Sequence, residues 1–227
     1  MAMRETGIII AIDGPAGSGK SSVARLVARR LGIVNLNTGA AYRAVGLLAL
    51  REGVDLGDGK ALGLLAGRVR LEPGGVLVDG RWVEEGELRD PEVSAAASRV
   101  SAHPEVRRVL LPVQREAAER ARRAGGAVVE GRDIGTVVLP GADLKVFLSA
   151  SPEERARRRA LQTGREEEVE RIRRAILERD RQDSERAVSP LRPAPDATVI
   201  DTTGMGLEEV VERVVRMARE AVPDGRG

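Results

Sequence analysis

Residues 8–22 read IIIAIDGPAGSGKSS and join an apolar strand pattern to a glycine-rich loop. The loop fits the phosphate-binding pattern GxxxxGK[ST] in the strand-loop-helix setting that this pattern requires. Its glycines permit a tight turn that points backbone N–H groups at phosphates, at the positive end of a helix predicted to reach Leu31. An ordinary glycine-rich turn is the alternative, but the complete motif favours a nucleoside triphosphate. The predicted binding residues are Gly14, Pro15, Ala16, Gly17, Ser18, Gly19, Lys20, Ser21 and Ser22.

The last three residues of this loop carry the polar side chains that triphosphate chemistry uses. Lys20 supplies a positive point charge to the terminal phosphates. The Ser21 hydroxyl is placed to ligate a magnesium ion, and Ser22 can bond another phosphate oxygen. We therefore predict Lys20 as a catalytic residue and Ser21 as a metal ligand.

The composition narrows the class of protein. With 227 residues and 42% hydrophobic residues, the chain suits one α/β domain over residues 1–227. It has no Cys, and no apolar stretch is long enough to span a membrane, so we expect a cytoplasmic protein. The 37 Lys and Arg are balanced by 35 Asp and Glu, and aromatic residues make up 1%, which argues against a nucleic-acid partner.

Apolar runs alternate with helical patterns along most of the chain. The runs that read as buried strands are Gly7–Ile12, Ala127–Val129, Leu144–Leu148 and Ala197–Ile200. This alternation predicts a parallel sheet flanked by helices. The segment at about 68–89 interrupts it with short runs around Asp79-Gly80, a strong hairpin signal, and predicts a small antiparallel insertion.

The segment at about 155–187 predicts a helical lid. Ser151-Pro152-Glu153-Glu154 is a capping box, and Gly164 separates the first helix from a long one spanning about Glu166 to Ala187. The long helix has a stripe that begins apolar and ends with Arg179, Asp183 and Arg186. That end overlooks either a nucleotide cleft or a partly buried salt-bridge cluster. On the first helix, Arg158 belongs to an arginine cluster that can close over ATP phosphates, although a surface role is the alternative for any single arginine.

Further polar residues follow the predicted strands, where an α/β sheet keeps its site. Arg132 and Asp133 come just after the run Ala127–Val129. Arg132 can bind a phosphate through two hydrogen bonds, and Asp133 can accept hydrogen bonds; the alternative is an ion pair in a tight turn. Arg43 can meet an acceptor phosphate or lie on a helix surface. Ser98 shares a helix face with other serines, a pattern that close packing also explains.

Several blocks together resemble the bacterial-type cytidylate kinases along the whole chain. In order, the blocks are IAIDGPAGSGKSS, NTGAAYR, AAASRVSAHPEVR, VVEGRDIGTVV, RARRRALQ, ERDRQDSERAVSPL and PAPDATVIDTT. The resemblance implies a nucleoside monophosphate kinase fold and transfer of a phosphoryl group from ATP, with Mg²⁺, to CMP and dCMP. It also implies a monomer.

The resemblance also implies roles for individual residues. Arg43 and Arg132, with Thr38, would hold the CMP phosphate, and Ser98, Arg107 and Asp133 would contact the cytosine ring. Arg179 and Asp183 would lie near the ribose, and Arg186 would reach the nucleotide from the lid side. Asn37-Thr38-Gly39 departs from the Asp-Ser-Gly of many relatives, so no metal ligand is assigned there.

The predicted chemistry needs no strong base, because an acceptor phosphate already carries an anionic oxygen near neutral pH. It needs charge neutralisation and in-line alignment, for which we expect Lys20, Arg132 and Arg158 to act as the catalytic residues. Kinases acting on UMP, AMP or GMP are the alternative enzymes. A nucleotide-regulated switch or a motor ATPase is the alternative from another class. That alternative predicts a guanine-specificity NKxD motif, or a long apolar run that ends in paired acidic residues, and the sequence has neither.

Overall fold

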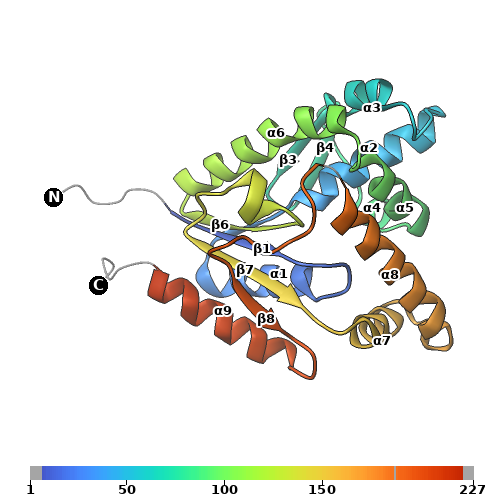
Figure 1. Cartoon of the computed structure of the whole chain (residues 1–227). Helices are drawn as coiled ribbons and strands as arrows, with labels where there is room; N and C mark the ends of the chain where they lie inside the picture. Colours follow the sequence, from blue (N-terminus) through green and yellow to red (C-terminus); the bar gives the residue numbers. More distant parts are fainter. Residues whose placement is uncertain (1–6, 187, 222–227) are drawn as a thin grey trace. The chain divides into compact units, whose positions relative to one another are not determined.

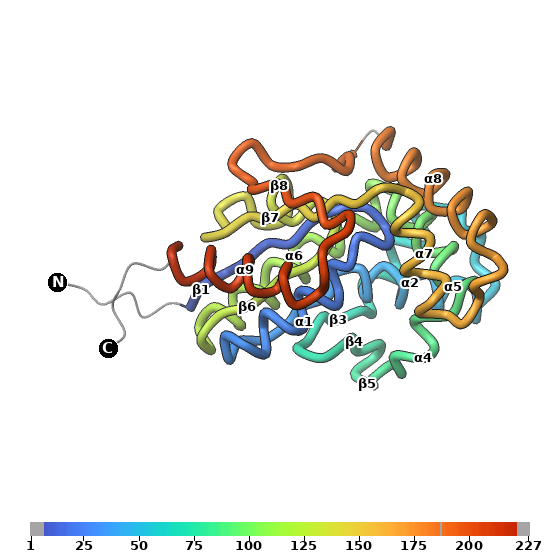
Figure 2. Tube along the Cα trace, turned by 90° about the horizontal axis from the view of Figure 1, so that it is seen from below, coloured from blue at the N-terminus to red at the C-terminus, as the bar shows by residue number. Residues whose placement is uncertain are grey.

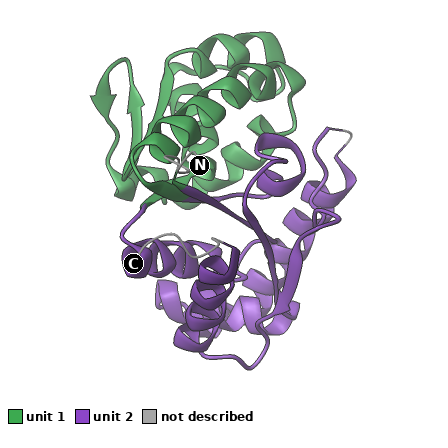
Figure 3. Cartoon of the chain, turned by 90° about the vertical axis from the view of Figure 1, so that its left-hand side faces the viewer, with its two compact units in different colours: residues 1–7, 34–127 green, residues 8–33, 128–227 purple. Residues whose placement is uncertain are grey.

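The computed structural model describes residues 7–186 and 188–221, which fall into two compact units (Figure 3). The first unit comprises residues 1–7 and 34–127, and the second comprises residues 8–33 and 128–227. That the whole chain acts as one kinase domain stays a prediction.

The second unit is built on the predicted parallel sheet (Figure 1). Its strands, in the order β6-β1-β7-β8, are β6 (Gly126–Glu130, whose first two residues belong to the first unit), β1 (Ile8–Asp13), β7 (Leu144–Ser149) and β8 (Thr198–Asp201). β1 pairs in parallel with β7, and β7 in parallel with β8. Both faces of β1 are buried, which explains its continuous apolar sequence.

Two helices lie beside each other along this sheet (Figure 2) and share an apolar core with it. α1 (Lys20–Leu31) and α9 (Leu207–Ala221) pack against each other and contribute Val23, Val27 and Val211 to a core that includes Ile12 and Leu148 of the strands. Burial of such side chains stabilises the sheet by roughly 1.5–3 kcal/mol each. The core therefore gives the loop between β1 and α1 a rigid support.

The remaining elements of the second unit follow β6 and β7. A short π-helix, η1 (Ile134–Val138), comes directly after Asp133. α7 (Pro152–Thr163) is capped by Ser151, whose hydroxyl accepts the Glu154 N–H at 3.2 Å, as the predicted capping box requires. The reciprocal bond of that box is not formed, because the Ser151 N–H donates to Thr203 Oγ1 and the Glu154 carboxylate accepts from Arg157 and Arg158. The predicted long helix starts with a 3₁₀ turn, η2 (Glu166–Glu168), and continues as α8 (Val169–Glu185), which packs against α7. Residue 187, the predicted end of the lid, lies outside the described residues.

The first unit is mainly helical and contains the predicted antiparallel insertion. Its elements are β2 (Val34–Asn37), α2 (Thr38–Glu52), α3 (Gly59–Ala66), β3 (Val69–Glu72), β4 (Gly75–Val78), β5 (Arg81–Trp82), α4 (Glu85–Leu88), α5 (Pro91–Val100) and α6 (Pro104–Arg123). The strands β3-β4-β5 form an antiparallel sheet. At the hairpin, Asp79 and Gly80 have φ of 51° and 78°, the left-handed conformation that a type I′ turn requires.

Among the described residues, no helix is both long enough and apolar enough to cross a lipid bilayer.

Candidate functional site

The phosphate-binding loop leaves β1 at Asp13 and enters α1 at Lys20. Gly14, Gly17 and Gly19 have φ of 147°, 77° and 87°, which side-chain-bearing residues rarely adopt. A Cβ on Gly14 would also lie 2.1 Å from the carbonyl oxygen of Leu148, so this position has no room for a side chain. The first turn of α1 has no acidic residue. The loop therefore offers backbone N–H groups and a positive helix end to an anion.

Lys20 is held inside this loop. Its side chain is buried, and its Nζ donates to the Pro15 carbonyl oxygen at 2.5 Å and to Ser18 Oγ at 3.3 Å. Burial, together with the positive charge of Arg132, holds the pKa of the Lys20 ammonium well below its ordinary value. A polyanion beside Lys20 would favour its charged form again.

Glu130 is a site residue to which the sequence analysis gave no role. It is the last residue of β6, it is 3% exposed, and its Oε2 accepts the Ser21 hydroxyl at 2.6 Å. A serine that donates its proton to a carboxylate keeps its oxygen lone pairs for a cation. Ser21 and Glu130 therefore fit a hard, oxygen-ligated ion such as Mg²⁺. The available signal was an acid at the carboxyl end of a buried strand.

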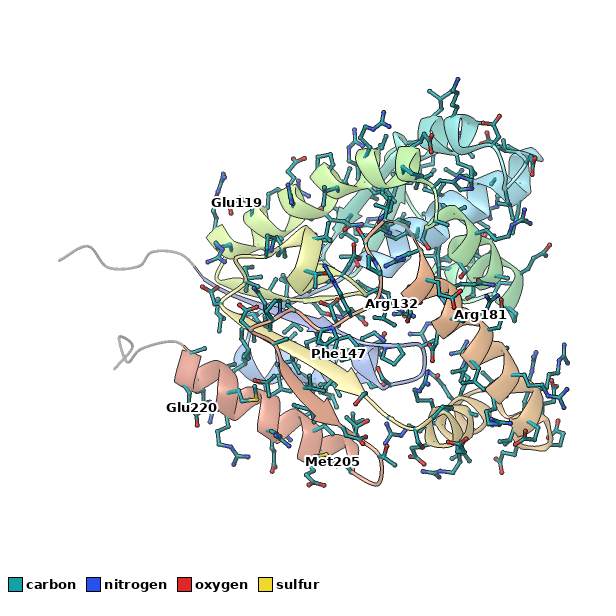
Figure 4. All side chains as sticks on the ribbon, viewed as in Figure 1. Glu119, Arg132, Phe147, Arg181, Met205 and Glu220 are labelled. Atoms are coloured by element: carbon teal, nitrogen blue, oxygen red, sulfur yellow. The ribbon has the colours of Figure 1, made fainter. Side chains whose placement is uncertain are left out.

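Arg132, Asp133, Arg179, Asp183 and Arg186 form one charged cluster in the second unit. Arg132 Nε donates to Asp183 Oδ2 at 3.0 Å, and Figure 4 labels Arg132 where the chain leaves β6. Arg186 lies 3.8 Å from Asp183 and 4.0 Å from Asp133. The predicted charged stripe of α8 therefore meets the residues that follow β6.

The charges of this cluster do not cancel. Burial raises the pKa of Asp183, but Arg132, Arg179 and Arg186 outweigh it, so the pKa lies below its ordinary value. Three guanidinium groups face two carboxylates, which leaves one excess positive charge in a partly buried region. The partly buried salt-bridge cluster that the sequence allowed for the end of α8 is present, with Arg132 paired to Asp183. The excess charge also suits an anionic ligand.

Asp13 connects the phosphate-binding loop to this cluster. It is 5% exposed, and its two carboxylate oxygens accept the N–H groups of Ile134 and Gly135 at 2.8 and 2.7 Å. Burial raises the pKa of Asp13 to about 6, against the opposing effect of these two hydrogen bonds. The sequence analysis gave Asp13 no role, because an acid that begins a glycine-rich loop does not show which amides it bonds.

The arginines of α7 have different surroundings from one another. Arg158 donates to Glu154 Oε1 at 2.8 Å and to Thr202 Oγ1 at 2.9 Å, and its Nη1 would lie 3.9 Å from a Cβ on Gly19. Arg155 is buried, bonds the Ala16 carbonyl oxygen at 3.0 Å and pairs with Asp180. Arg155 therefore ties α7 to the phosphate-binding loop, and Arg158 lies beside that loop.

The other predicted substrate residues lie in the first unit. Thr38 is buried at the start of α2, and a Cβ on Gly39 would lie 3.2 Å from Arg43 Nη1, so this glycine leaves room for the guanidinium. Arg107 is buried and lies over the ring of Tyr42, 5.5 Å from its centroid. This contact joins α6 to α2 by a cation–π interaction.

Ser98 and Arg107 are linked through one residue. Arg107 Nη1 donates to the Ser101 carbonyl oxygen at 3.1 Å, and the Ser101 hydroxyl donates to the Ser98 carbonyl oxygen at 2.9 Å. The predicted site residues thus form one set in each unit: Thr38, Arg43, Ser98 and Arg107 in the first, and the phosphate-binding loop with the charged cluster and Arg158 in the second.

Comparisons with known proteins agree on one family. The family model described as cytidylate kinase matches residues 10–220. A cytidylate kinase of Solibacter usitatus is 44% identical over 98% of this chain and 97% of its own. A cytidylate kinase of Pelotomaculum thermopropionicum is 49% identical over 91% of this chain and 93% of its own.

One solved structure shares the fold at low identity. It is an uncharacterized protein from Eubacterium ventriosum, with a TM-score of 0.55 and 12% identity over 94% of this chain and 98% of that chain.

Proposed function

This chain belongs to the cytidylate kinase family, and on that premise we propose that it transfers the γ-phosphoryl group of ATP, with Mg²⁺, to CMP and dCMP. The products are ADP and CDP or dCDP. The acceptor phosphate attacks directly, so the reaction forms one P–O bond to the acceptor as the bond to ADP breaks.

One observation carries this proposal. Within the second unit, Lys20 of the phosphate-binding loop lies close enough to Arg132 and Arg179 of the charged cluster for their charges to lower its pKa. Cations that face both a donor and an acceptor phosphate neutralise the charge that builds up during in-line transfer. No base is required, since the acceptor oxygen is already ionised.

The donor side is assigned to the loop. The backbone of residues 14–19 surrounds the ATP phosphates, with Lys20 and Ser22 bonding phosphate oxygens. Ser21 and Glu130 hold Mg²⁺, which supplies charge neutralisation to the terminal phosphates when bound. Arg158, beside Gly19, stabilises the transferring group and is a catalytic residue with Lys20 and Arg132.

The acceptor roles are proposed residue by residue, from the resemblance to the family. Arg43 and Arg132, with Thr38, bind the CMP phosphate. Ser98, Arg107 and Asp133 bind the cytosine ring, Arg179 and Asp183 the ribose, and Arg186 the nucleotide from the side of the lid. Selectivity for CMP over UMP follows from Asp133, whose carboxylate accepts a hydrogen bond from the cytosine amino group. The same carboxylate repels the carbonyl oxygen that uracil has at that position.

The test measures ADP production by the purified protein from Mg-ATP with CMP, dCMP, UMP, AMP or GMP, and with no acceptor. Fast turnover with CMP and dCMP alone supports the proposal. A preference for UMP or a purine nucleotide would mean that the acceptor residues are assigned wrongly. Turnover without an acceptor would favour a nucleotide-hydrolysing switch.

We also propose that the enzyme works as a monomer in the cytoplasm, with no nucleic-acid or membrane partner. The balanced charge and low aromatic content argue against a nucleic-acid partner. Light scattering during size-exclusion chromatography measures the mass, and a mass of about twice the chain's 24.3 kDa would contradict the monomer.

A further inference from the structure

The Asp13 carboxylate accepts two backbone hydrogen bonds that have no part in the proposed chemistry. Oδ1 accepts the Ile134 N–H at 2.8 Å and Oδ2 accepts the Gly135 N–H at 2.7 Å. These two amides open η1, and the first amides of a helix have no partner within it. An ionised carboxylate has the shape to satisfy both at once.

The two ends of this contact belong to the two halves of the proposed reaction. Asp13 directly precedes Gly14, where a Cβ would lie 2.1 Å from the Leu148 carbonyl oxygen. The bonded amides directly follow Arg132 and Asp133, the residues assigned to the acceptor phosphate and base. A second link, from the Gly131 N–H to the Ile12 carbonyl oxygen at 3.0 Å, runs beside it.

We infer that Asp13 is a positioning residue: by holding the two amides after Arg132-Asp133, its carboxylate sets both side chains for the acceptor nucleotide relative to the phosphate-binding loop. This inference rests on the proposed acceptor site. No nucleotide contact is assigned to Asp13, and it acts through the backbone of η1.

The energetics of burial support a role beyond folding. A carboxylate with 5% exposure gives up its hydration, and the resulting rise in its pKa to about 6 shows that two hydrogen bonds do not offset this fully. The ionised form of Asp13 therefore lowers the stability of the folded protein at neutral pH. Such a cost is typical of residues that serve a site.

The test compares Asp13→Asn with the wild-type enzyme at pH 8, where both Asp13 and the CMP phosphate are ionised. The amide side chain offers one oxygen, so one of the two buried N–H groups loses its acceptor. We expect KM for CMP to rise about tenfold and the CMP to UMP ratio of kcat/KM to fall, with a smaller change in KM for ATP.

Asp143→Asn is the matched control. Asp143 Oδ2 accepts the Ile9 N–H at 2.8 Å, so this substitution alters a carboxylate–amide bond on the same strand, at the other end from the loop. KM for CMP should not change in this variant. A purely structural role for Asp13 would lower the melting temperature and the active fraction and leave KM for CMP and the CMP to UMP ratio as in the wild type, which would overturn the inference.

Two further variants complete the design. If Asp13 acts through Asp133, then Asp13→Asn should change the CMP to UMP ratio of kcat/KM little in an Asp133→Asn background, and additive effects would contradict the inference.

Arg132→Lys separates the inference about Asp13 from the proposed acceptor site. An unchanged KM for CMP in Arg132→Lys refutes the acceptor site itself, whereas a raised KM there with a normal KM in Asp13→Asn refutes only the role of Asp13. If Asp13→Asn does not fold, Asp13→Glu, which misplaces the oxygens, receives the same measurements and the same criteria.

Discussion

Asp183→Asn should weaken both the fold and acceptor binding. The residue is 5% exposed, and its Oδ2 accepts a hydrogen bond from Arg132 Nε at 3.0 Å. Asparagine keeps the shape and can accept one hydrogen bond, but it removes the negative charge that faces Arg132, Arg179 and Arg186. A buried hydrogen bond to a charged group contributes about 2 kcal/mol, so we expect the free energy of unfolding to fall by about that amount.

The assay is urea unfolding at pH 7, with KM for CMP measured in parallel. Glu178→Gln is the matched control, because Glu178 also pairs with an arginine, Arg181, on α8. That pair is exposed to solvent, where screening makes ion pairs weak, and the control should unfold as the wild type does (Figure 4). KM for CMP should rise in Asp183→Asn and stay constant in Glu178→Gln.

The pH dependence gives a second test of the same reasoning. The pKa of Asp183 is lowered in the folded protein, so its stabilising effect is present above the ordinary value of 3.8 and is lost as the pH falls through the folded pKa. The stability difference between wild type and Asp183→Asn should therefore shrink in acid. Equal unfolding free energies at pH 7, or a difference that grows on acidification, would refute the electrostatic role assigned to Asp183.

Three other predictions concern the metal site, the recognition of the nucleobase and the pH dependence of stability. Ser21→Ala and Glu130→Gln should each raise the Mg²⁺ concentration at which the rate is half-maximal, and a magnesium titration of kcat that superimposes on the wild type would exclude the pair as the metal site. Asp133→Ala should reduce the ratio of kcat/KM for CMP to that for UMP by roughly ten- to a hundredfold; an unchanged ratio removes Asp133 from base recognition. The pKa of Asp13 is raised from 3.8 to about 6 in the folded protein, so the folded state binds a proton more readily than the unfolded state. The free energy of unfolding of the wild type should therefore fall by roughly 3 kcal/mol as the pH rises from 3.8 to about 6. Unfolding of Asp13→Asn over the same pH range should lack this slope, and parallel curves would show that another group causes it.

The sequence analysis identified the elements whose signals are local. The strands β1, β6 and β7 are apolar runs with buried faces, β8 is a shorter run in which Ile200 is buried, and the hairpin was set by Asp79-Gly80. The helices α3 and η1 were not predicted. The first has two glycines among its first five residues, and the second reads IGTVV, which is rich in β-branched residues and gives no helical period.

These missed elements depend on contacts between distant residues. α3 packs against α6, about forty positions further along the chain. η1 begins where Asp13 accepts the N–H groups of Ile134 and Gly135, residues more than 120 positions away. Tertiary hydrogen bonds of this kind override local preference, because a buried N–H without an acceptor costs about 1–3 kcal/mol.

The sequence by itself determined the phosphate-binding loop, because the glycine spacing and Lys20 encode that conformation and its charge within a few residues. It also marked Arg132, Asp133 and the charged end of α8 as candidates. Only the tertiary structure decided that Arg132 bonds Asp183, that Ser21 bonds Glu130 and that Asp13 holds the start of η1. Each of these bonds joins residues 51 to 122 positions apart, and such pairing depends on the packing of the sheet and its helices, which no local pattern records.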